Sequence, residues 1–302
     1  MDVFQPALDM YAAGATPNPD ISCNREIKFG KLFDKLKSRS NDKKWWLATG
    51  HYARSAISTK TGRPVLLRSQ DPNKDQTLFL SQISQESLAH TIFPLARFTK
   101  PEVREMAKIL LPEKIATKPD SQGLCFVEPC SGRHFSTFLK DYLPPPSPAS
   151  VCLEDGRVVG HHPSIWLATI GERSRLNFRR SQQLNPGGQW YVAAKSVSPP
   201  SYTIVPGKDH PMLYSRSLIA SHWKWIDENE NWDGESLVAQ IRHRQIPLQC
   251  TVNSLGHGRM KVNFEVEGGV YGVTPGQAVG VWYGERCLGG GNIESSTDIR
   301  ST

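Results

Sequence analysis

The sequence has no long hydrophobic run and no recognisable targeting segment at its start. Its apolar stretches fall short of the roughly 20 residues that cross a membrane, so we expect no membrane partner. The first residues, from Met1 to Gln5, have neither the basic and apolar composition of a secretory signal nor the Arg- and Ser-rich composition of a transit peptide. We therefore expect no targeting segment in this chain.

Paired cysteine motifs are also missing. The six cysteines lie at wide and irregular intervals, at Cys23, Cys125, Cys130, Cys152, Cys250 and Cys287. No two of them form the CxxC pair of a zinc site, and their spacing is unlike that of a small disulfide-stapled module. We therefore predict no metal and a reducing compartment, where a cysteine is either buried and inert or catalytic.

Charge is the first positive signal. Lys and Arg together number 36 against 29 for Asp and Glu, which gives a net charge of +7. A basic protein favours polyanionic partners such as nucleic acid, because each phosphate contact releases counterions. A generically basic surface is the alternative interpretation at this stage.

Residues 1–147 read as an α/β region, and its first half carries two helical patterns. One helix is predicted from Phe4 to Ala13 and is closed by Gly14. A second is predicted to start at Asn24 as its N-cap, with an apolar face that carries Phe29, Leu32, Phe33 and Leu36.

The second half of this region alternates short strands with one more helix. Residues 45–49 form an apolar run that ends at Gly50 and His51, which is typical of a buried strand whose end meets a site. Runs on either side of residues 61–63 predict a hairpin. A capping box from Thr99 to Glu102 predicts a basic helix with its apolar face at Val103, Met106, Ala107 and Leu110.

A proline-rich stretch at residues 144–148 predicts a domain boundary, because proline continues neither a helix nor a central strand. Beyond it the composition is all-β, with strand-like runs at residues 201–205, 237–242, 262–266 and 279–283. We predict three domains: an α/β domain at 1–147, a small β domain at 148–212 and a C-terminal β-barrel at 213–302.

The segment Thr16-Pro17-Asn18-Pro19-Asp20-Ile21-Ser22-Cys23-Asn24 is the densest in chemistry. Its prolines stiffen a loop that displays Asn18, Asp20 and Cys23. A helix beginning at Asn24 would place its positive N-terminal end beside Cys23 and lower the pKa of that thiol. A proline-rich turn with an incidental cysteine explains the segment equally well.

A second segment, residues 118–127, leads from polar residues into a short strand with Cys125 at the transition. A cysteine in that position is ordinarily part of a core. Two cysteines about 100 residues apart that meet in one cleft can instead pass sulfur, one as a persulfide and the other by resolving it. Two further segments lie between the two cysteines, and each is a weak indication of function by itself. Residues 49–54 are typical of a histidine at the end of a strand, and residues 71–76 of a solvated turn.

Together these segments resemble the tRNA-specific 2-thiouridylase family, in its bacterial and mitochondrial forms. The resemblance covers nearly the whole chain and is loosest at residues 150–200. The matching segments include Thr16-Pro17-Asn18-Pro19-Asp20, Cys23-Asn24, residues 48–54, residues 73–76, Asp120-Ser121, residues 123–126, residues 169–173, Arg242-His243-Arg244, residues 273–277 and residues 287–291.

The resemblance implies an adenine-nucleotide α-hydrolase-like domain and a tRNA-thiolating activity. ATP would adenylate the C2 oxygen of a flipped-out wobble uridine at position 34, in tRNAs with Lys-, Glu- or Gln-type anticodon arms. Cys125 would carry persulfide sulfur from a donor protein, Cys23 would resolve it to a disulfide, and Asp20 would act as acid or base. The resemblance implies that Asn18, Pro19 and Asp20 bind the target base and that Gly50 binds the nucleotide. The residues that it implies to contact tRNA are His51, Lys74, Asp75, Gln76, Arg242, His243 and Gln277.

One feature of the family is missing from the sequence. Family members begin with a Ser-Gly-Gly-Val-Asp-Ser-type phosphate loop, which has no counterpart here. We therefore expect an incomplete nucleotide domain with unpaired strand edges and exposed apolar surface. An inactive tRNA-binding fragment or isoform is the alternative function. Ser-, Thr- and Lys-rich insertions favour a mitochondrial location over the bacterial cytoplasm.

Overall fold

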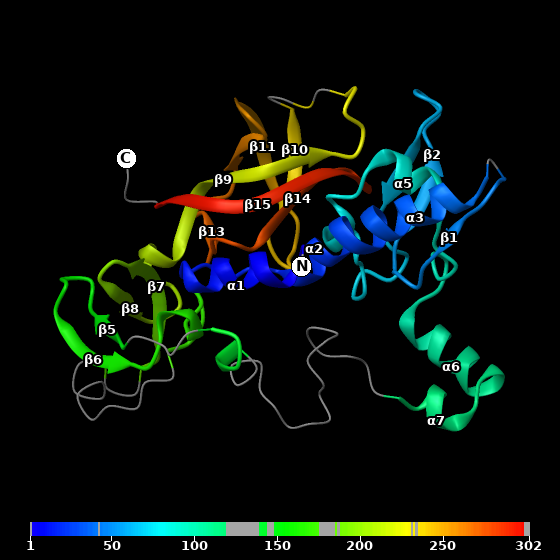
Figure 1. The fold of residues 1–302 in the computed structure, drawn as a ribbon. Helices are drawn as coiled ribbons and strands as arrows, with labels where there is room; N and C mark the ends of the chain where they lie inside the picture. The colour runs from blue at the N-terminus through cyan, green and yellow to red at the C-terminus, as the bar shows by residue number, and fades with distance from the viewer. Residues whose placement is uncertain are drawn as a thin grey trace.

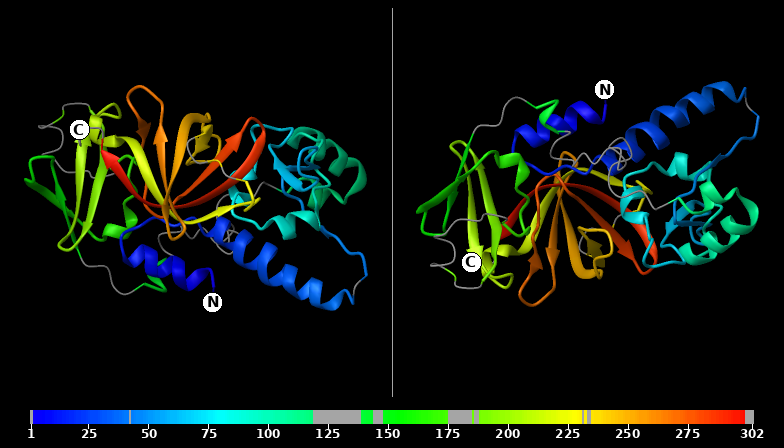
Figure 2. Two further views of the ribbon diagram at one scale, coloured as in Figure 1. Left: turned by 90° about the horizontal axis from the view of Figure 1, so that it is seen from above. Right: turned by 90° about the horizontal axis from the view of Figure 1, so that it is seen from below.

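The computed structural model describes residues 2–41, 43–118, 139–143, 148–174, 185, 188–230, 232 and 235–298. Its strands form sheets of two, four and nine strands (Figure 1). The nine-stranded sheet lies in the middle, with the α/β portion at one end and the four-stranded sheet at the other (Figure 2). The predicted fold class is confirmed. The predicted domain limits stay predictions, and residues 144–147 lie outside the described part.

Six strands of the large sheet close into a barrel. In order around the ring they are β9 (Tyr214–Trp225), β12 (Arg259–Phe264), β11 (Leu248–Gly256), β10 (Ser236–Gln240), β14 (Ala278–Tyr283) and β15 (Arg286–Asp298). β15 pairs back with β9, which completes the ring, and the short β13 (Val270–Tyr271) adds to β9. Alternate residues point inward and build one core that includes Leu218, Val252, Val262 and Val281.

A hairpin from the α/β portion extends this barrel. β2 (Arg54–Ile57) and β3 (Pro64–Leu67) pair antiparallel, which confirms the hairpin predicted from the sequence. β3 also pairs with β15, at Leu66 opposite Cys287, so that two predicted domains share one sheet. The pairing joins residues about 220 positions apart, and no local pattern could have indicated it.

The four-stranded sheet runs in the order β6 (Val158–His162), β5 (Ala149–Cys152), β8 (Pro200–Pro206) and β7 (Trp190–Val197). β5 and β8 are parallel and the other neighbours antiparallel. Val151 and Ile204 are buried between this sheet and the short helix η3 (Ile165–Leu167). A second short helix, η4 (Pro211–Leu213), leads into the barrel.

The N-terminal helices lie along one side of the barrel (Figure 2). α1 (Phe4–Ala12) confirms the first predicted helix and packs Leu8 and Tyr11 against Leu139, Leu143 and Trp166. It is followed by α2 (Pro19–Ser22), the π-helical η1 (Cys23–Lys31) and α3 (Leu32–Arg39). These three form one helical run with a kink at Gly30.

The predicted helix start at Asn24 is wrong. The helix begins at Pro19, because the side chain of Asn18 accepts a hydrogen bond from the amide of Asp20 at 3.2 Å and proline suits the first helical position. Asn24 is buried inside the run, where its Nδ2 donates to the carbonyl of Phe79 at 3.0 Å. Its amide holds two segments together instead of capping a helix.

The remaining α/β elements surround a small parallel sheet. β1 (Leu47–Ala48) pairs with β4 (Thr91–Ile92), beside α4 (Thr77–Leu80) and α5 (Gln85–Ala89). The prediction of a buried strand at 45–49 is wrong, since the strand has two residues, Ala48 is exposed and Trp46 is 60% exposed. α6 (Lys100–Leu110) starts at the predicted capping box, buries none of its residues and leads to α7 (Glu113–Ala116).

Candidate functional site

The start of α2 fixes two of the three predicted catalytic residues. Asp20 lies in the first turn and Cys23 follows three residues later, which places both on one face of the helix. Burial raises the pKa of the Asp20 carboxyl, and the nearby Lys28 opposes that shift. A carboxyl with a raised pKa can hold a proton at a pH where an exposed aspartate has lost it, which suits an acid or base.

The predicted setting of Cys23 is wrong in one respect. Because the helix starts at Pro19, Cys23 lies after the first turn and not at the N-terminal end, where the helix dipole acts most strongly. Its side chain is half-buried. Cys125 lies outside the described residues, so its pairing with Cys23 stays a prediction.

His51 and Gly50 follow β1, close to the same helical run. The ring of His51 lies 5.8 Å from that of Phe29, and its Nδ1 is 2.6 Å from Oγ1 of Thr49. Burial, with a smaller contribution from Lys28, lowers the pKa of His51 to about 4. His51 is therefore neutral at pH 7. Lys28 acts on both Asp20 and His51, which places all three groups in one electrostatic neighbourhood.

A cavity of about 580 Å³ opens where the α/β portion, the portion with the four-stranded sheet and the barrel meet. Asn18 and Ile21 line it from the start of α2, whereas Asp20 and Cys23 of the same helical run are not among its lining residues. Its other walls include Glu172, Lys208, Arg242, His243, Tyr271 and Gln277. Four predicted residues, Asn18, Arg242, His243 and Gln277, thus share one cavity.

Two of these residues also hold the cavity walls together. Gln277 donates from Nε2 to the carbonyl of Thr16 at 2.7 Å, and the Thr16 amide donates to the carbonyl of Pro275 at 2.9 Å. Arg242 donates to the carbonyl of Tyr271 at 2.9 Å and to that of Gly272. Each side chain therefore ties part of the barrel to a neighbouring segment of the site.

The wall residues that the sequence analysis did not name as functional include Glu172, Lys208 and Tyr271. The hydroxyl of Tyr271 donates to the carbonyl of Gly171 at 2.5 Å, which connects the portion with the four-stranded sheet to the barrel. Only Glu172 lay in a segment already singled out, residues 169–173. The other two stand at the cavity only because of long-range packing, which leaves no local signal.

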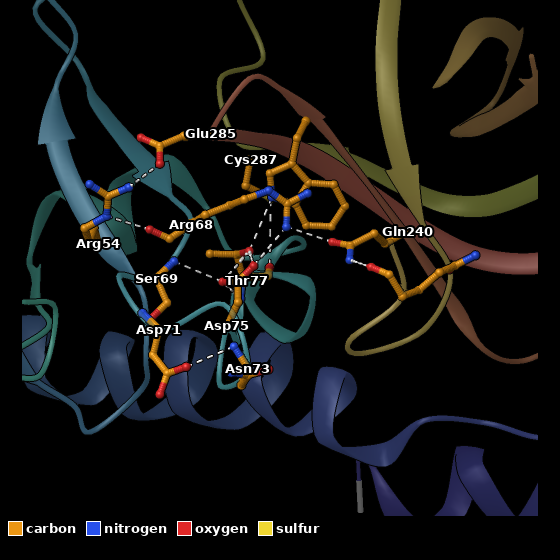
Figure 3. A network of polar contacts seen from close by, with 12 residues as sticks. Arg54, Arg68, Ser69, Asp71, Asn73, Asp75, Thr77, Gln240, Glu285 and Cys287 are labelled. Carbon is orange, nitrogen blue, oxygen red and sulfur yellow. Dashed lines mark hydrogen bonds and ion pairs between the residues drawn. The ribbon is translucent and has the colours of Figure 1, made fainter. Parts of the chain in front are cut away.

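None of the predicted tRNA contacts at residues 74–76 lines the first cavity. The Asp75 carboxylate accepts from Arg68 Nη1 at 2.9 Å and from the amide and hydroxyl of Thr77 (Figure 3). Oε1 of Gln76 accepts from the amide of Tyr52 at 2.9 Å. Both side chains thus accept hydrogen bonds from other residues of the protein. Lys74, which precedes them, is half-buried, and Asn73 is exposed.

A second cavity, of about 500 Å³, lies over this network and includes Arg68, Asn73, Asp75, Gln240, His243 and Arg244 in its walls. His243 therefore borders both cavities. Its ring packs against Phe79 with 5.3 Å between centroids, and burial together with Arg244 lowers its pKa.

In the described part of the chain, no three His, Cys, Asp or Glu side chains gather as a metal site would require. No helix there is long and apolar enough to cross a membrane.

Comparison with known families gives two matches. Residues 1–129 match the tRNA methyl transferase HUP domain, and residues 215–293 match the aminomethyltransferase beta-barrel domain. These ranges contain the helix with Asp20 and Cys23 and the closed barrel, respectively.

Curated relatives match nearly the whole chain. The mitochondrial tRNA-specific 2-thiouridylase 1 of Schizosaccharomyces pombe is 39% identical over 97% of this chain and 72% of its own length. The tRNA-specific 2-thiouridylase MnmA of Stutzerimonas stutzeri is 41% identical over 98% of this chain and 75% of its own length. The tRNA-specific 2-thiouridylase MnmA of Bacillus subtilis is 40% identical over 97% of this chain and 74% of its own length. On this similarity the chain belongs to the tRNA-specific 2-thiouridylase family of sulfurtransferases.

Proposed function

We propose that the protein takes part in tRNA 2-thiolation by transferring persulfide sulfur to C2 of the wobble uridine at position 34. The observation that carries this proposal is the cavity whose walls include Asn18, Arg242, His243 and Gln277. It opens at the start of the helix that bears Asp20 and Cys23. A uridine must leave the base stack to expose its C2 edge, and a cavity of about 580 Å³ has room for a flipped nucleotide.

ATP is the proposed co-substrate, and it supplies an adenylyl group that makes the C2 oxygen a good leaving group. Gly50 follows the carboxyl end of β1 in a parallel pair, the edge at which α/β sheets bind nucleotides. A Cβ built on Gly50 meets no atom within 4 Å, so a ligand has room to approach that backbone. Gly50 would contact the nucleotide, and the charge of Lys28 acts on both Asp20 and His51.

In the proposed sulfur step, the terminal sulfur of a persulfide on Cys125 forms a bond to C2, and the activated oxygen departs. The Cys23 thiolate then attacks the Cys125 sulfur, which releases 2-thiouridine and leaves a Cys23–Cys125 disulfide. A dithiol reductant returns both thiols. Asp20, with its raised pKa, would accept a proton from the target uracil and later return it.

The test is conversion of tRNA with Lys-, Glu- or Gln-type anticodons by this chain with an N-terminal phosphate loop fused ahead of it. ATP and a persulfide donor protein are present, and 2-thiouridine is measured by mass spectrometry of nucleosides. We expect Cys125→Ser and Cys23→Ser to abolish conversion. Cys152→Ser, at a half-buried thiol of the four-stranded sheet, is the matched control and should change conversion by less than about twofold.

The same assay separates the alternative function. Conversion should require an N-terminal phosphate loop fused ahead of this chain, since none is recognisable in the sequence. Full conversion by the extended protein with Cys125→Ser would overturn the cysteine assignment. Salt-sensitive tRNA binding without turnover, in both the chain and its extended form, would support a non-catalytic tRNA-binding protein instead.

For the location we propose mitochondria, with the bacterial cytoplasm as the alternative. The support is the mitochondrial relative of Schizosaccharomyces pombe, set against bacterial relatives of similar identity. Fractionation of the natural host followed by detection with an antibody distinguishes the two. A signal confined to the cytosolic fraction would rule out the mitochondrial location.

A further inference from the structure

The loop between α1 and α2, residues 13–18, crosses a turn of the barrel that runs from residue 274 to residue 277 (Figure 1). Two hydrogen bonds join the loop and the turn. The amide of Thr16 donates to the carbonyl of Pro275 at 2.9 Å, and its carbonyl accepts from Nε2 of Gln277 at 2.7 Å. Both backbone groups of Thr16 are therefore bound to the barrel.

Gly276 lies between these two hydrogen-bonding residues and touches the backbone of the loop. A Cβ built on Gly276 would lie 2.9 Å from both N and C of Thr16 and 3.0 Å from N of Pro17. These are backbone atoms, which cannot rotate aside as the end of a long side chain can. Gly276 also has a φ of 93°, in the region that favours glycine. The contact therefore requires glycine, and we call residues 275–277 the clamp.

The clamp is fixed to the core of the barrel. The amide of Gly276 donates to the carbonyl of Ile293 at 2.8 Å, and the amide of Ile293 donates to the carbonyl of Gln277 at 2.7 Å. Ile293 belongs to β15 and is buried in the barrel core. The clamp is thus held by the strand that closes the ring, and it gives the loop a rigid support.

A stiff link leads from Thr16 to the first turn of α2. Pro17 and Pro19 have a fixed φ, and the residue before each proline is restricted as well. The side chain of Asn18 also accepts a hydrogen bond from the amide of Asp20 at 3.2 Å. A displacement of Thr16 therefore moves the start of the helix, because the residues between them have little freedom to compensate.

We propose that the clamp is a positioning element for the sulfur-transfer reaction. Gly276 and Gln277 hold Thr16 in place, and the stiff link then sets where Asp20 and Cys23 lie. The clamp thereby gives the barrel a part in the chemical step that is separate from any contact with tRNA. This inference rests on the proposed function, because it takes the helix that begins at Pro19 as the one that serves the reaction.

The first test measures kcat and KM for tRNA in the chain extended by the phosphate loop. Gly276→Ala should lower kcat about tenfold and change KM by less than about twofold, since a misplaced reactive group slows the chemistry without removing a contact to RNA. Gly268→Ala is the matched control. Gly268 has a φ of 75°, but a Cβ there meets no atom within 4 Å, so the variant adds backbone strain without the contact. Equal losses of kcat in the two variants would overturn the proposal.

A milder variant tests the clamp without strain in its backbone. Gln277→Leu removes the hydrogen bond to the carbonyl of Thr16 and keeps a side chain of similar size. It should lower kcat about threefold at an unchanged KM. A raised KM at an unchanged kcat would assign Gln277 to tRNA binding alone and overturn its positioning role.

The position of Cys23 is also measurable without conversion of tRNA. The purified chain is alkylated with iodoacetamide, and the peptide that carries Cys23 is followed by mass spectrometry. The rate in Gly276→Ala should differ at least about threefold from that in Gly268→Ala, because thiol reactivity depends on local charge and exposure. Equal rates would overturn the proposal even in an active enzyme. If the rates differ but the extended wild type converts no tRNA, the proposed function fails and the positioning of Cys23 by the clamp is retained.

Discussion

The barrel and the α/β portion are stabilised by different kinds of contact. The barrel closes on itself, and side chains such as Leu218 and Val252 are fully buried in its core. The α/β portion has a sheet of only two short strands, and in α6 Ile109 is 83% exposed. Near the site its segments are fixed by contacts to the barrel, such as Gln277 to Thr16. The site therefore depends on the barrel for its geometry, and each of the following changes tests that dependence.

The largest effect is expected from Trp282→Ala. Trp282 is fully buried between the barrel and α4, donates to Oγ1 of Thr77 at 3.3 Å and lies under the Arg68 guanidinium. Its loss should lower the free energy of unfolding by about 3–5 kcal/mol in a urea titration. The control Trp46→Ala removes a tryptophan that is 60% exposed, and should cost under about 1 kcal/mol. Equal losses would mean that the barrel does not support the α/β portion.

A pH dependence is expected from His51. The pKa of His51 is about 4 in the folded protein, against an ordinary value of 6.5. As the pH falls, this histidine is therefore protonated in the unfolded chain at a higher pH than in the folded protein. The free energy of unfolding should be unaffected by this group above pH 6.5 and should fall between pH 6.5 and 4 by at most about 3 kcal/mol.

His51→Asn should remove that decline, as measured by urea titrations across the pH range. His257→Asn, at an exposed position in the β11–β12 turn of the barrel, should leave the decline unchanged. If the wild type and His51→Asn show the same slope, the burial of a neutral His51 is contradicted.

A smaller effect is expected where two strands of the barrel approach closely. A Cβ at Gly290 would lie 2.3 Å from the carbonyl oxygen of Val279, so Gly290→Ala should lower the free energy of unfolding by about 1–3 kcal/mol. Gly50→Ala adds the same methyl group in the α/β portion, where no atom lies within 4 Å. A thermal melt that shows the two variants to be equally stable would refute the close packing of β14 and β15.

The smallest effect is expected at the capping box of α6. The Thr99 amide donates to Oε2 of Glu102 at 2.7 Å, and the Thr99 side chain caps the third helical residue. Thr99→Ala should destabilise the helix by about 1 kcal/mol. Because α6 buries no residue, hydrogen exchange should speed up in its amides while the amides of the barrel stay protected.

The sequence predicted those features that depend on neighbours in the chain. The box at Thr99 and the hairpin around Gly62 were found because capping and turn chemistry is local. Asn18 and Pro19 carried an equally local signal for the start of α2, but the apolar spacing after Asn24 placed the predicted N-cap six residues too late.

Other features depend on distant parts of the chain and were not predictable from one sequence. Tyr271 and Lys208 reach the first cavity only because the barrel and the portion with the four-stranded sheet pack together there. The roles of Arg242 and Gln277 as braces follow from carbonyls of segments that the fold brings to them. That Asp20, Cys125 and the predicted tRNA contacts act in one reaction stays a prediction.

The strand β15 sets an order of events during synthesis. It pairs with β14, with β9 and with the hairpin strand β3, and it is the last strand of the ring in the chain. Until residues 286–298 have left the ribosome, the barrel stays an open sheet and β3 pairs only with β2. Both cavities take walls from the barrel, so a nascent chain acquires its binding surfaces only as translation of that strand ends.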